Sequence, residues 1–353
     1  FLNCLWLVIL INDAKLTPTG PGWSILPAGV PAGARAQMNA PRRKTAMATA
    51  PITRFAPSPT GRLHLGHAFS ALVASRLGGG YRLRIDDIDH TRCRPEYTEQ
   101  IYDDLAFLGL PWRDEPVFQS DRLNCYAQAL DRLREMDLVY PCFLTRAELA
   151  EVLSAPHKPP TGTDVVLSAD EAARRARSGM MPAWRLRTAK ALELAESPTW
   201  LDLRTGSRRS VDMSAHGDVI VARRDIRTSY HLSVVIDDHD MGITHIIRGD
   251  DHMTNAARQT QIYNALGWQV PVFAHLPLIH GSDGAKLSKR HGALGVDAYR
   301  NMGLLPEAMR NYLARLGWSH GDDEIFTTEQ LITWFGLEAI GKSPARFDMT
   351  KLE

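Results

Sequence analysis

The stretch RFAPSPTGRLHLGHAFSALVASRL, which runs from Arg54 to Leu77, decides how the fold begins. Pro57 and Pro59 exclude a helix from its first part, because proline lacks the N–H of the helical ladder and restricts the residue before it. Beyond His64, apolar residues recur at helical spacing, and the glycines at 78–80 end the pattern. We therefore predict a short strand, a loop and a helix.

Strand and helix patterns alternate after this opening stretch. YRLRIDDID (81–89) is typical of a strand that ends in acidic residues, and PEYTEQIYDDLAFLGL (95–110) and SDRLNCYAQALDRLREMDLVY (120–140) are amphipathic like helices. A strand–helix–strand–helix order indicates an α/β fold with a parallel sheet.

Residues 143–216 differ in character and predict an inserted α+β domain. Capping-box patterns at 145–148 and 168–171 predict helix starts, and AWRLR (183–187) and TWLDL (199–203) resemble short strands.

The sheet is expected to resume after the insertion. GDVIVARRD (217–225), SYHLSVVIDD (229–238) and ITHIIRGDD (243–251) predict strands, whereas TNAARQTQIYNALGW (254–268) predicts a helix. From Val296 onward the pattern is helical.

Composition narrows the class of protein. The chain has 353 residues, 44% of them hydrophobic, with 41 basic and 40 acidic residues and a net charge of +1. This suits two or three globular domains, and any nucleic acid must be attracted by local patches rather than by the net charge. Four cysteines without a CxxC pair predict no disulfide framework and a cytoplasmic protein.

The first fifty residues form a separate leader. FLNCLWLVILI is an apolar run of 11 residues, too short to span a bilayer, and it lacks a basic region before it. A signal peptide stays open, since AGARAQ contains an A-x-A-like site. We favour upstream sequence with a true start at Met38 or Met47, and we expect disorder over 12–50.

Two histidines on the first turn of the predicted helix suggest a ligand site. His64 and His67 are three residues apart and face the same way, and Gly66 between them allows a flat group near the backbone. They could be metal ligands, packed side chains or contacts for an anion at the helix N-terminus. A metal would need a third ligand, which this helix does not supply.

A basic loop lies far downstream. KLSKRHG, from Lys286 to Gly292, carries two lysines and an arginine between glycines. It is either a solvated loop or a mobile set of cations that folds over a triphosphate and neutralises developing charge.

Together these motifs resemble a known family. HLGH resembles the HIGH signature and KLSKR the KMSKS signature of class I aminoacyl-tRNA synthetases. TRFAPSPTG, RIDDID and YHLSVVIDDHDMGITHIIRGDDH are similar to the glutamyl branch of that class. The resemblance covers about residues 52–353.

The resemblance implies a Rossmann-type doubly wound parallel sheet with an inserted α+β domain and a C-terminal helical stem segment. It implies that ATP, with Mg²⁺, activates L-glutamate and that the glutamyl group passes to tRNA. His64, His67, Lys286 and Lys289 match the catalytic positions. The ATP-binding set that the resemblance implies is His64, Gly66, His67, Lys286, Ser288 and Lys289.

The glutamate pocket is implied in the same way. Arg54 and Arg248 match the arginines that hold the side-chain carboxylate, and Ser58 and Tyr230 match positions lining the pocket. Asp86 stands where relatives carry the glutamate that holds the substrate ammonium, so we predict weaker glutamate binding.

Arg248 has an alternative interpretation. It could instead form a surface ion pair with Asp250 or Asp251.

The implied domains are a leader and four parts of the enzyme. Their bounds are 1–50 for the leader, 51–142 for the first half of the catalytic domain, 143–216 for the inserted domain that binds the acceptor end, 217–295 for the second catalytic half, and 296–353 for the stem segment. The anticodon-binding domain is expected to be absent.

Several features depart from the family pattern. Residues 52–235 look most like glutamyl-Q tRNA(Asp) synthetase, which glutamylates queuosine, and 237–353 look like glutamyl-tRNA synthetase. ASRLGGGY is shorter than the equivalent connection in relatives. Cys142 lacks a partner at ligand spacing, so no zinc is predicted.

Three hypotheses follow. The leading one is a monomeric glutamyl-tRNA synthetase that does not bind membranes, and its partners are tRNA(Glu), L-glutamate and ATP. The alternative enzyme is the glutamyl-Q synthetase, with tRNA(Asp) as partner. The hypothesis of another class is an inactive tRNA-binding remnant.

Overall fold

The computed structural model describes residues 50–154, 165–194, 198–213, 217–281, 283–285, 287, 294–341 and 343–353. The expectations for the leader lie outside these residues, and so do those for Lys286, Ser288 and Lys289. No helix in the described ranges is long and apolar enough to cross a membrane.

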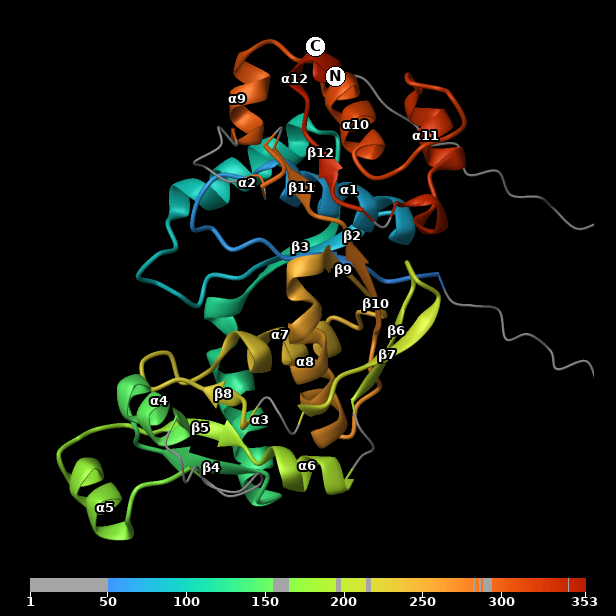
Figure 1. Ribbon diagram of the computed structural model, residues 1–353. Coiled ribbons are helices and arrows are strands. Elements are labelled where there is room, and N and C mark those ends of the chain that lie inside the picture. The colour runs from blue at the N-terminus through green and yellow to red at the C-terminus, as the bar shows by residue number, and fades with distance from the viewer. Residues whose placement is uncertain are drawn as a thin grey trace, which may run out of the picture. The chain divides into compact units, whose positions relative to one another are not determined.

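The elements follow each other in α/β order along much of the chain (Figure 1). The helices are α1 (Leu65–Gly78), α2 (Pro95–Phe107), α3 (Leu123–Glu135), α4 (Arg146–Ser154), α5 (Ala169–Arg177), α6 (Thr188–Leu194), α7 (Tyr230–Asp240), α8 (Met253–Ala265), α9 (Val296–Asn301), α10 (Pro306–Arg315), α11 (Thr328–Trp334) and α12 (Met349–Leu352). The strands are β1 (Arg54–Phe55), β2 (Tyr81–Ile85), β3 (Trp112–Phe118), β4 (Val139–Cys142), β5 (Ala183–Leu186), β6 (Thr199–Asp202), β7 (Ser207–Ser210), β8 (Ile220–Ala222), β9 (His245–Gly249), β10 (Val272–Leu276), β11 (Ile279–His280) and β12 (Ala345–Arg346).

A mainly parallel sheet organises the part of the chain from β1 to β10. Strands β3, β2 and β1 pair in that order, and β9, β10, β6 and β7 form a second row. A parallel bridge from Thr53 to His245 joins the rows beside β1. The order therefore reverses between β1 and β9, and in such sheets ligands bind in the crevice at the reversal. The predicted Rossmann-type α/β fold is confirmed.

Helix α1 starts at the carboxyl end of β1 and packs against β9 and α10 (Figure 1). Its predicted end is confirmed, because Gly79 closes the helix in the left-handed conformation with φ of 60°. A Cβ on Gly78 would meet the Thr53 hydroxyl at 2.4 Å. Glycine at this position thus lets the helix lie close to the strand.

The strand prediction for SYHLSVVIDD is wrong. These residues begin α7, whose start is capped by Ser229 as its hydroxyl accepts from the Leu232 N–H at 3.3 Å. The residues from Leu232 to Asp238 are all buried, since α7 packs against both α3 and α8. A short apolar run that is buried on every side has no period that separates a helix from a buried strand.

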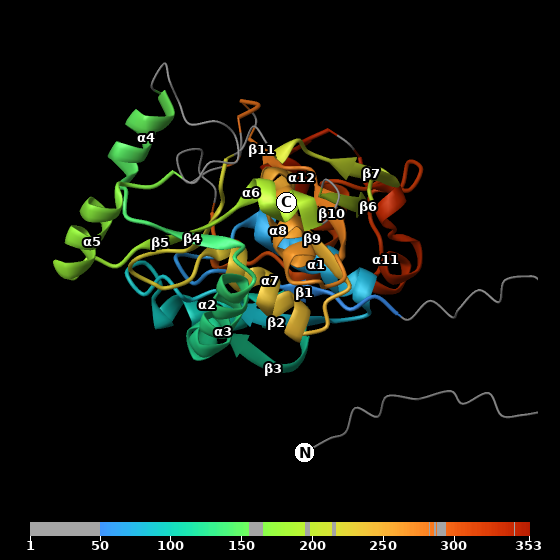
Figure 2. The ribbon, with the colours of Figure 1, turned by 90° about the horizontal axis from the view of Figure 1, so that it is seen from below.

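The insertion region contributes strands to two sheets. Antiparallel strands β4, β5 and β8 form a small sheet (Figure 1). Figure 2 shows β4 and β5 on the same side of the molecule as α4 and α5. In contrast, β6 pairs in parallel with β10 of the main sheet and carries β7 at its edge. The strands of region 143–216 therefore do not form one separate sheet: β5 pairs with strands outside the expected boundaries, and β6 pairs with the main sheet.

Two details of the region match the sequence patterns. The predicted capping box is present at Thr145, whose hydroxyl accepts from the Glu148 N–H while the Glu148 carboxylate accepts from the Thr145 N–H. At the second helix start, the Ser168 hydroxyl accepts from the Glu171 N–H.

The described part of the C-terminal segment contains the predicted helices, α9 to α12, separated by loops and the short strand β12, and it packs against α1. Phe69 of α1 shares a core with Leu313, Trp318 and Phe335. A Cβ on Gly317 would meet the Phe69 ring at 2.9 Å, so the segment lies directly against the helix that begins at the crevice.

Candidate active site

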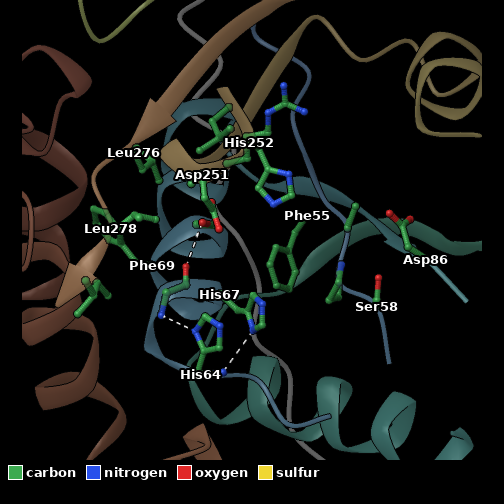
Figure 3. A pocket seen from close by; sticks show the side chains of 18 of the residues that line it. Phe55, Ser58, His64, His67, Phe69, Asp86, Asp251, His252, Leu276 and Leu278 are labelled. Carbon is green, nitrogen blue, oxygen red and sulfur yellow. Dashed lines mark hydrogen bonds between the residues drawn. The ribbon is translucent and has the colours of Figure 1, made fainter. Parts of the chain in front are cut away.

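A cavity of about 390 Å³ lies where the strand order reverses. Its walls come from β1 and the loop after it, the start of α1, the end of β2, the start of α7, β9, and the segment after β10. Figure 3 shows Ser58 and Asp86 on one side, Leu276 and Leu278 on the other, and His67 toward the α1 end. The cavity brings together all the site residues predicted within the described chain, namely Arg54, Ser58, His64, Gly66, His67, Asp86, Tyr230 and Arg248.

The two histidines form the start of α1. His64 is the N-cap residue, and its Nδ1 accepts from the Gly66 N–H at 3.1 Å. His67 Nδ1 accepts from the His64 N–H at 3.3 Å, which completes a capping box (Figure 3). The rings stack with centroids 3.7 Å apart.

These bonds fix the tautomer of both rings. A neutral imidazole that accepts at Nδ1 carries its proton on Nε2, so both histidines are N–H donors at Nε2. The first turn of α1 holds no acidic residue, which suits an anion at a helix N-terminus.

Gly66 makes this arrangement feasible. A Cβ at this position would meet the His64 ring at 3.0–3.1 Å. The flat group that approaches the Gly66 backbone is therefore the imidazole of His64 itself.

A buried network of charges forms the wall below β1 and β2. Arg84 is fully buried, and it donates to Asp86 at 2.6 Å and to Asp238 at 2.6 Å. Arg54 donates from Nε to the same Asp238 carboxylate at 3.1 Å. Asp238 on α7 thus contacts the predicted glutamate-binding residue Arg54 directly, and it is linked to the other one, Asp86, through Arg84.

Burial changes the acidity of Asp86. It raises the pKa of this carboxyl to about 6, although Arg84 acts in the opposite direction. Asp86 is therefore an anion at neutral pH and can lie opposite an ammonium group.

Arg248 has quite different surroundings. Its side chain is buried, with 7% of the residue exposed. It donates to the side-chain amide oxygen of Gln259 at 2.6 Å and to Nε2 of His275 at 3.4 Å. Within the described residues, no carboxylate forms an ion pair with Arg248, and its buried Nη2 has no hydrogen-bond partner. Burial lowers the pKa of the guanidinium to about 10, so it remains a cation.

The alternative interpretation of Arg248 as a surface residue is wrong for two reasons. The side chain is buried, and the nearby Asp250 lies 3.7 Å from Arg204 instead.

Tyr230 and Ser58 lie at the more open part of the cavity. The Tyr230 hydroxyl is 3.4 Å from Nδ1 of His252, and 37% of the residue is exposed. Ser58 is exposed on the loop after β1.

Several site residues escaped sequence reasoning. Arg84 and Asp238 orient the predicted ligand-binding groups, and Gln259 and His275 hold Arg248. The acidic pair at the end of VVIDD could have indicated Asp238, whereas no motif marks Gln259 or His275.

No group of three or more His, Cys, Asp or Glu side chains suited to a metal ion occurs in the part of the chain that the structure describes. Cys142 is buried and its thiol lies 3.5 Å from the Val165 carbonyl.

Comparisons with known proteins identify the family of the chain. Residues 52–353 match the family described as tRNA synthetases class I (E and Q), catalytic domain. Glutamate–tRNA ligase 2 of Rhodospirillum rubrum is 52% identical over 308 residues, covering 85% of this chain and 64% of the relative. Glutamate–tRNA ligase 2 of Parvibaculum lavamentivorans is 51% identical over 310 residues, covering 86% and 62%.

A solved structure is also similar to the chain. The glutamate tRNA ligase of Elizabethkingia meningosepticum, in complex with its amino acid, is similar with a TM-score of 0.73 at 31% identity. The match covers 86% of the present chain and 68% of the Elizabethkingia chain. The present chain spans a little under two thirds of the curated relatives, and the similarity continues through both halves that resembled different enzymes. The chain belongs to the class I tRNA synthetases of the E and Q type.

Proposed function

We propose that this chain activates L-glutamate with ATP and transfers the glutamyl group to tRNA. The observation that carries the proposal is the buried Arg248 guanidinium, a cation without a carboxylate partner in the described chain, at a cavity that also contains the α1 N-terminus. A ligand carboxylate would supply the missing anion.

Activation requires no covalent nucleophile from the protein. The glutamate α-carboxylate attacks the α-phosphorus of ATP, the bond to the bridging oxygen breaks, and pyrophosphate leaves with that electron pair. His64 and His67 would donate from Nε2 to phosphate oxygens, beside the N–H groups of α1 and Gly66. Mg²⁺ would arrive with ATP and neutralise phosphate charge.

The basic loop completes the nucleotide site in this proposal. Lys286, Ser288 and Lys289 match the family's ATP-binding positions, and the lysines would stabilise the charge that develops on the phosphates.

The amino acid would lie between the two charged walls. Arg248 would bind the side-chain carboxylate, with Arg54, Ser58 and Tyr230 around it, and Asp86 would hold the ammonium. Glutamine would be rejected, since an uncharged amide leaves the buried cation without its anion.

The finer assignments are also proposals. The inserted region 143–216 would contact the acceptor end of tRNA and the segment 296–353 its stem. We expect a cytoplasmic monomer. Relatives named glutamate–tRNA ligase over both halves do not favour a glutamyl-Q enzyme or an inactive remnant.

The test is ATP–pyrophosphate exchange with L-glutamate, with and without tRNA. Exchange that needs tRNA supports the proposal, exchange without tRNA supports the glutamyl-Q alternative, and no exchange in either case supports the remnant. L-glutamine serves as the control amino acid.

A further inference from the structure

Behind Arg248 lies a buried pair, Asp202 and His275, that the proposed reaction does not use. Both side chains are fully buried, and His275 Nδ1 lies 2.9 Å from an Asp202 carboxylate oxygen. Burial alone would raise the pKa of Asp202, but His275, the Thr205 N–H and the charge of Arg209 together outweigh burial and lower it. Burial lowers the pKa of His275. The pair is thus a carboxylate and a neutral imidazole.

The protonation state fixes the direction of the hydrogen bonds. A carboxylate only accepts, so His275 donates from Nδ1 to Asp202. The other ring nitrogen, Nε2, is then an acceptor, and it faces the Arg248 Nε–H at 3.4 Å.

Other contacts among the described residues also restrain the guanidinium. Gln259 accepts from Nη1 at 2.6 Å, and the Phe273 ring centroid lies 5.0 Å from the Arg248 Cζ. The guanidinium is planar with its donors in a rigid fork, so fixing Nε and Nη1 also fixes the direction of Nη2. Nη2 is a buried atom without a hydrogen-bond partner in the described part of the chain.

The sheet brings these residues together. Arg248 of β9 lies directly opposite His275 of β10, and Asp202 of β6 is registered with Phe273, two residues before His275 on the same face. Three adjacent strands, β6, β10 and β9, therefore hold a chain of hydrogen bonds that runs from Asp202 through His275 to Arg248.

We propose that Asp202 and His275 are a positioning pair that aims Nη2 of Arg248 at the side-chain carboxylate of the bound amino acid. Through this aim the pair sets the affinity and the acid-over-amide specificity of the site. The inference rests on the proposed function, because it takes Arg248 as the carboxylate-binding residue.

Asp202 also has a structural contact that the test must separate from this role. Its other oxygen accepts from the Thr205 N–H at 3.3 Å and lies 3.5 Å from the Thr205 hydroxyl in the β6–β7 turn. Thr205→Val removes the hydroxyl and leaves the carboxylate on His275, so it is the matched control.

Two kinds of substitution break this chain of hydrogen bonds. Asp202→Asn can present an amide N–H to His275, which forces Nδ1 to accept and Nε2 to donate against the Arg248 Nε–H. His275→Asn places no acceptor near Arg248, whereas His275→Gln can place its carbonyl oxygen where Nε2 was.

The experiment measures dissociation constants of L-glutamate and of ATP by calorimetry on the full chain, with melting temperatures alongside. We expect Asp202→Asn and His275→Asn to weaken glutamate binding about tenfold and leave ATP binding within about twofold. His275→Gln should recover most of that loss, and Thr205→Val should resemble the parent.

Three results would overturn the inference: unchanged glutamate affinity in Asp202→Asn, equal loss of glutamate and ATP affinity, or no difference between His275→Gln and His275→Asn. If Arg248→Met weakens glutamate binding and the pair variants do not, the positioning role alone fails. If Arg248→Met also leaves glutamate affinity unchanged, the proposed function fails with it.

Discussion

Two arginines reach the same cavity from neighbouring strands, yet they have opposite surroundings. Arg54 on β1 donates to the Asp238 carboxylate, whereas Arg248 on β9 has Gln259, a neutral His275 and the Phe273 ring around it. A guanidinium with its own counterion is already neutralised, while one without it attracts an anion. Under the proposed function, the difference predicts that Arg54 shapes the pocket and that Arg248 binds the ligand charge.

Asp238→Asn removes the counterion of Arg54 and should have the largest effect of the substitutions considered. It leaves the buried Arg54 and Arg84 with one fewer negative charge between them. We expect the free energy of unfolding to fall by about 3 kcal/mol, measured by urea denaturation. Asp240→Asn on the half-exposed end of α7 is the control, and a similar small loss in both variants would contradict the prediction.

Arg248→Met tests the arginine that lacks a counterion among the described residues. Glutamate affinity should fall about 100-fold, because the ligand carboxylate would be buried without a partner. Stability should move the opposite way, with a rise in melting temperature of about 2 °C, since the substitution removes a buried cation that has no counterion among the described residues.

The matched variant is Arg54→Met, which should lower the melting temperature because it takes a partner from Asp238. Calorimetry and thermal unfolding measure both effects. Equal signs for the two melting-temperature changes would show that the counterion does not distinguish the arginines.

The pH dependence of glutamate activation tests the proposed role of the Asp86 carboxylate. The Asp86 pKa is about 6, so the carboxylate that would hold the ammonium is lost as the pH falls below that value. The ratio kcat/KM for glutamate in pyrophosphate exchange should fall about tenfold per pH unit below 6.

Loss of the fold would not explain this decline. The pKa of Asp86 is higher in the folded chain than its ordinary value of 3.8, so protonation through this window favours the folded state. Asp86→Asn should remove the inflection near pH 6, and an inflection that persists in this variant would assign it to another group.

Asp86→Glu should have the smallest effect. The added CH₂ restores the usual reach of the family's carboxylate, and we expect the KM for glutamate to fall about twofold to threefold. The tight bond to Arg84 at 2.6 Å limits the gain. A KM that is unchanged would mean that the shorter side chain already reaches the ammonium.

Sequence patterns located the start of α1 and the strand before Asp86, whereas the roles of His64, Asp86 and Arg248 were implied by the resemblance and stay predictions. The three residues line one cavity because strand ends of one parallel sheet meet at one edge. Sequence reasoning failed for α7, since a helix that is buried on all sides lacks a polar stripe.

The contacts that orient the site were also out of reach. Arg84 and Asp238 are 154 positions apart, and their bond depends on how α7 packs against the sheet. Asp202 looked like part of an insertion, but β6 pairs with β10, and that pairing brings the carboxylate behind Arg248.

The cap of α1 has one more consequence. Because Nδ1 of His64 accepts the hydrogen bond at the helix start and Nε2 is the ring's donor, the helix cap and the proposed phosphate contact would use opposite edges of one imidazole. Asparagine is a good N-cap and can replace the first edge but not the second. His64→Asn is therefore a separation-of-function variant, expected to keep its melting temperature while ATP affinity falls.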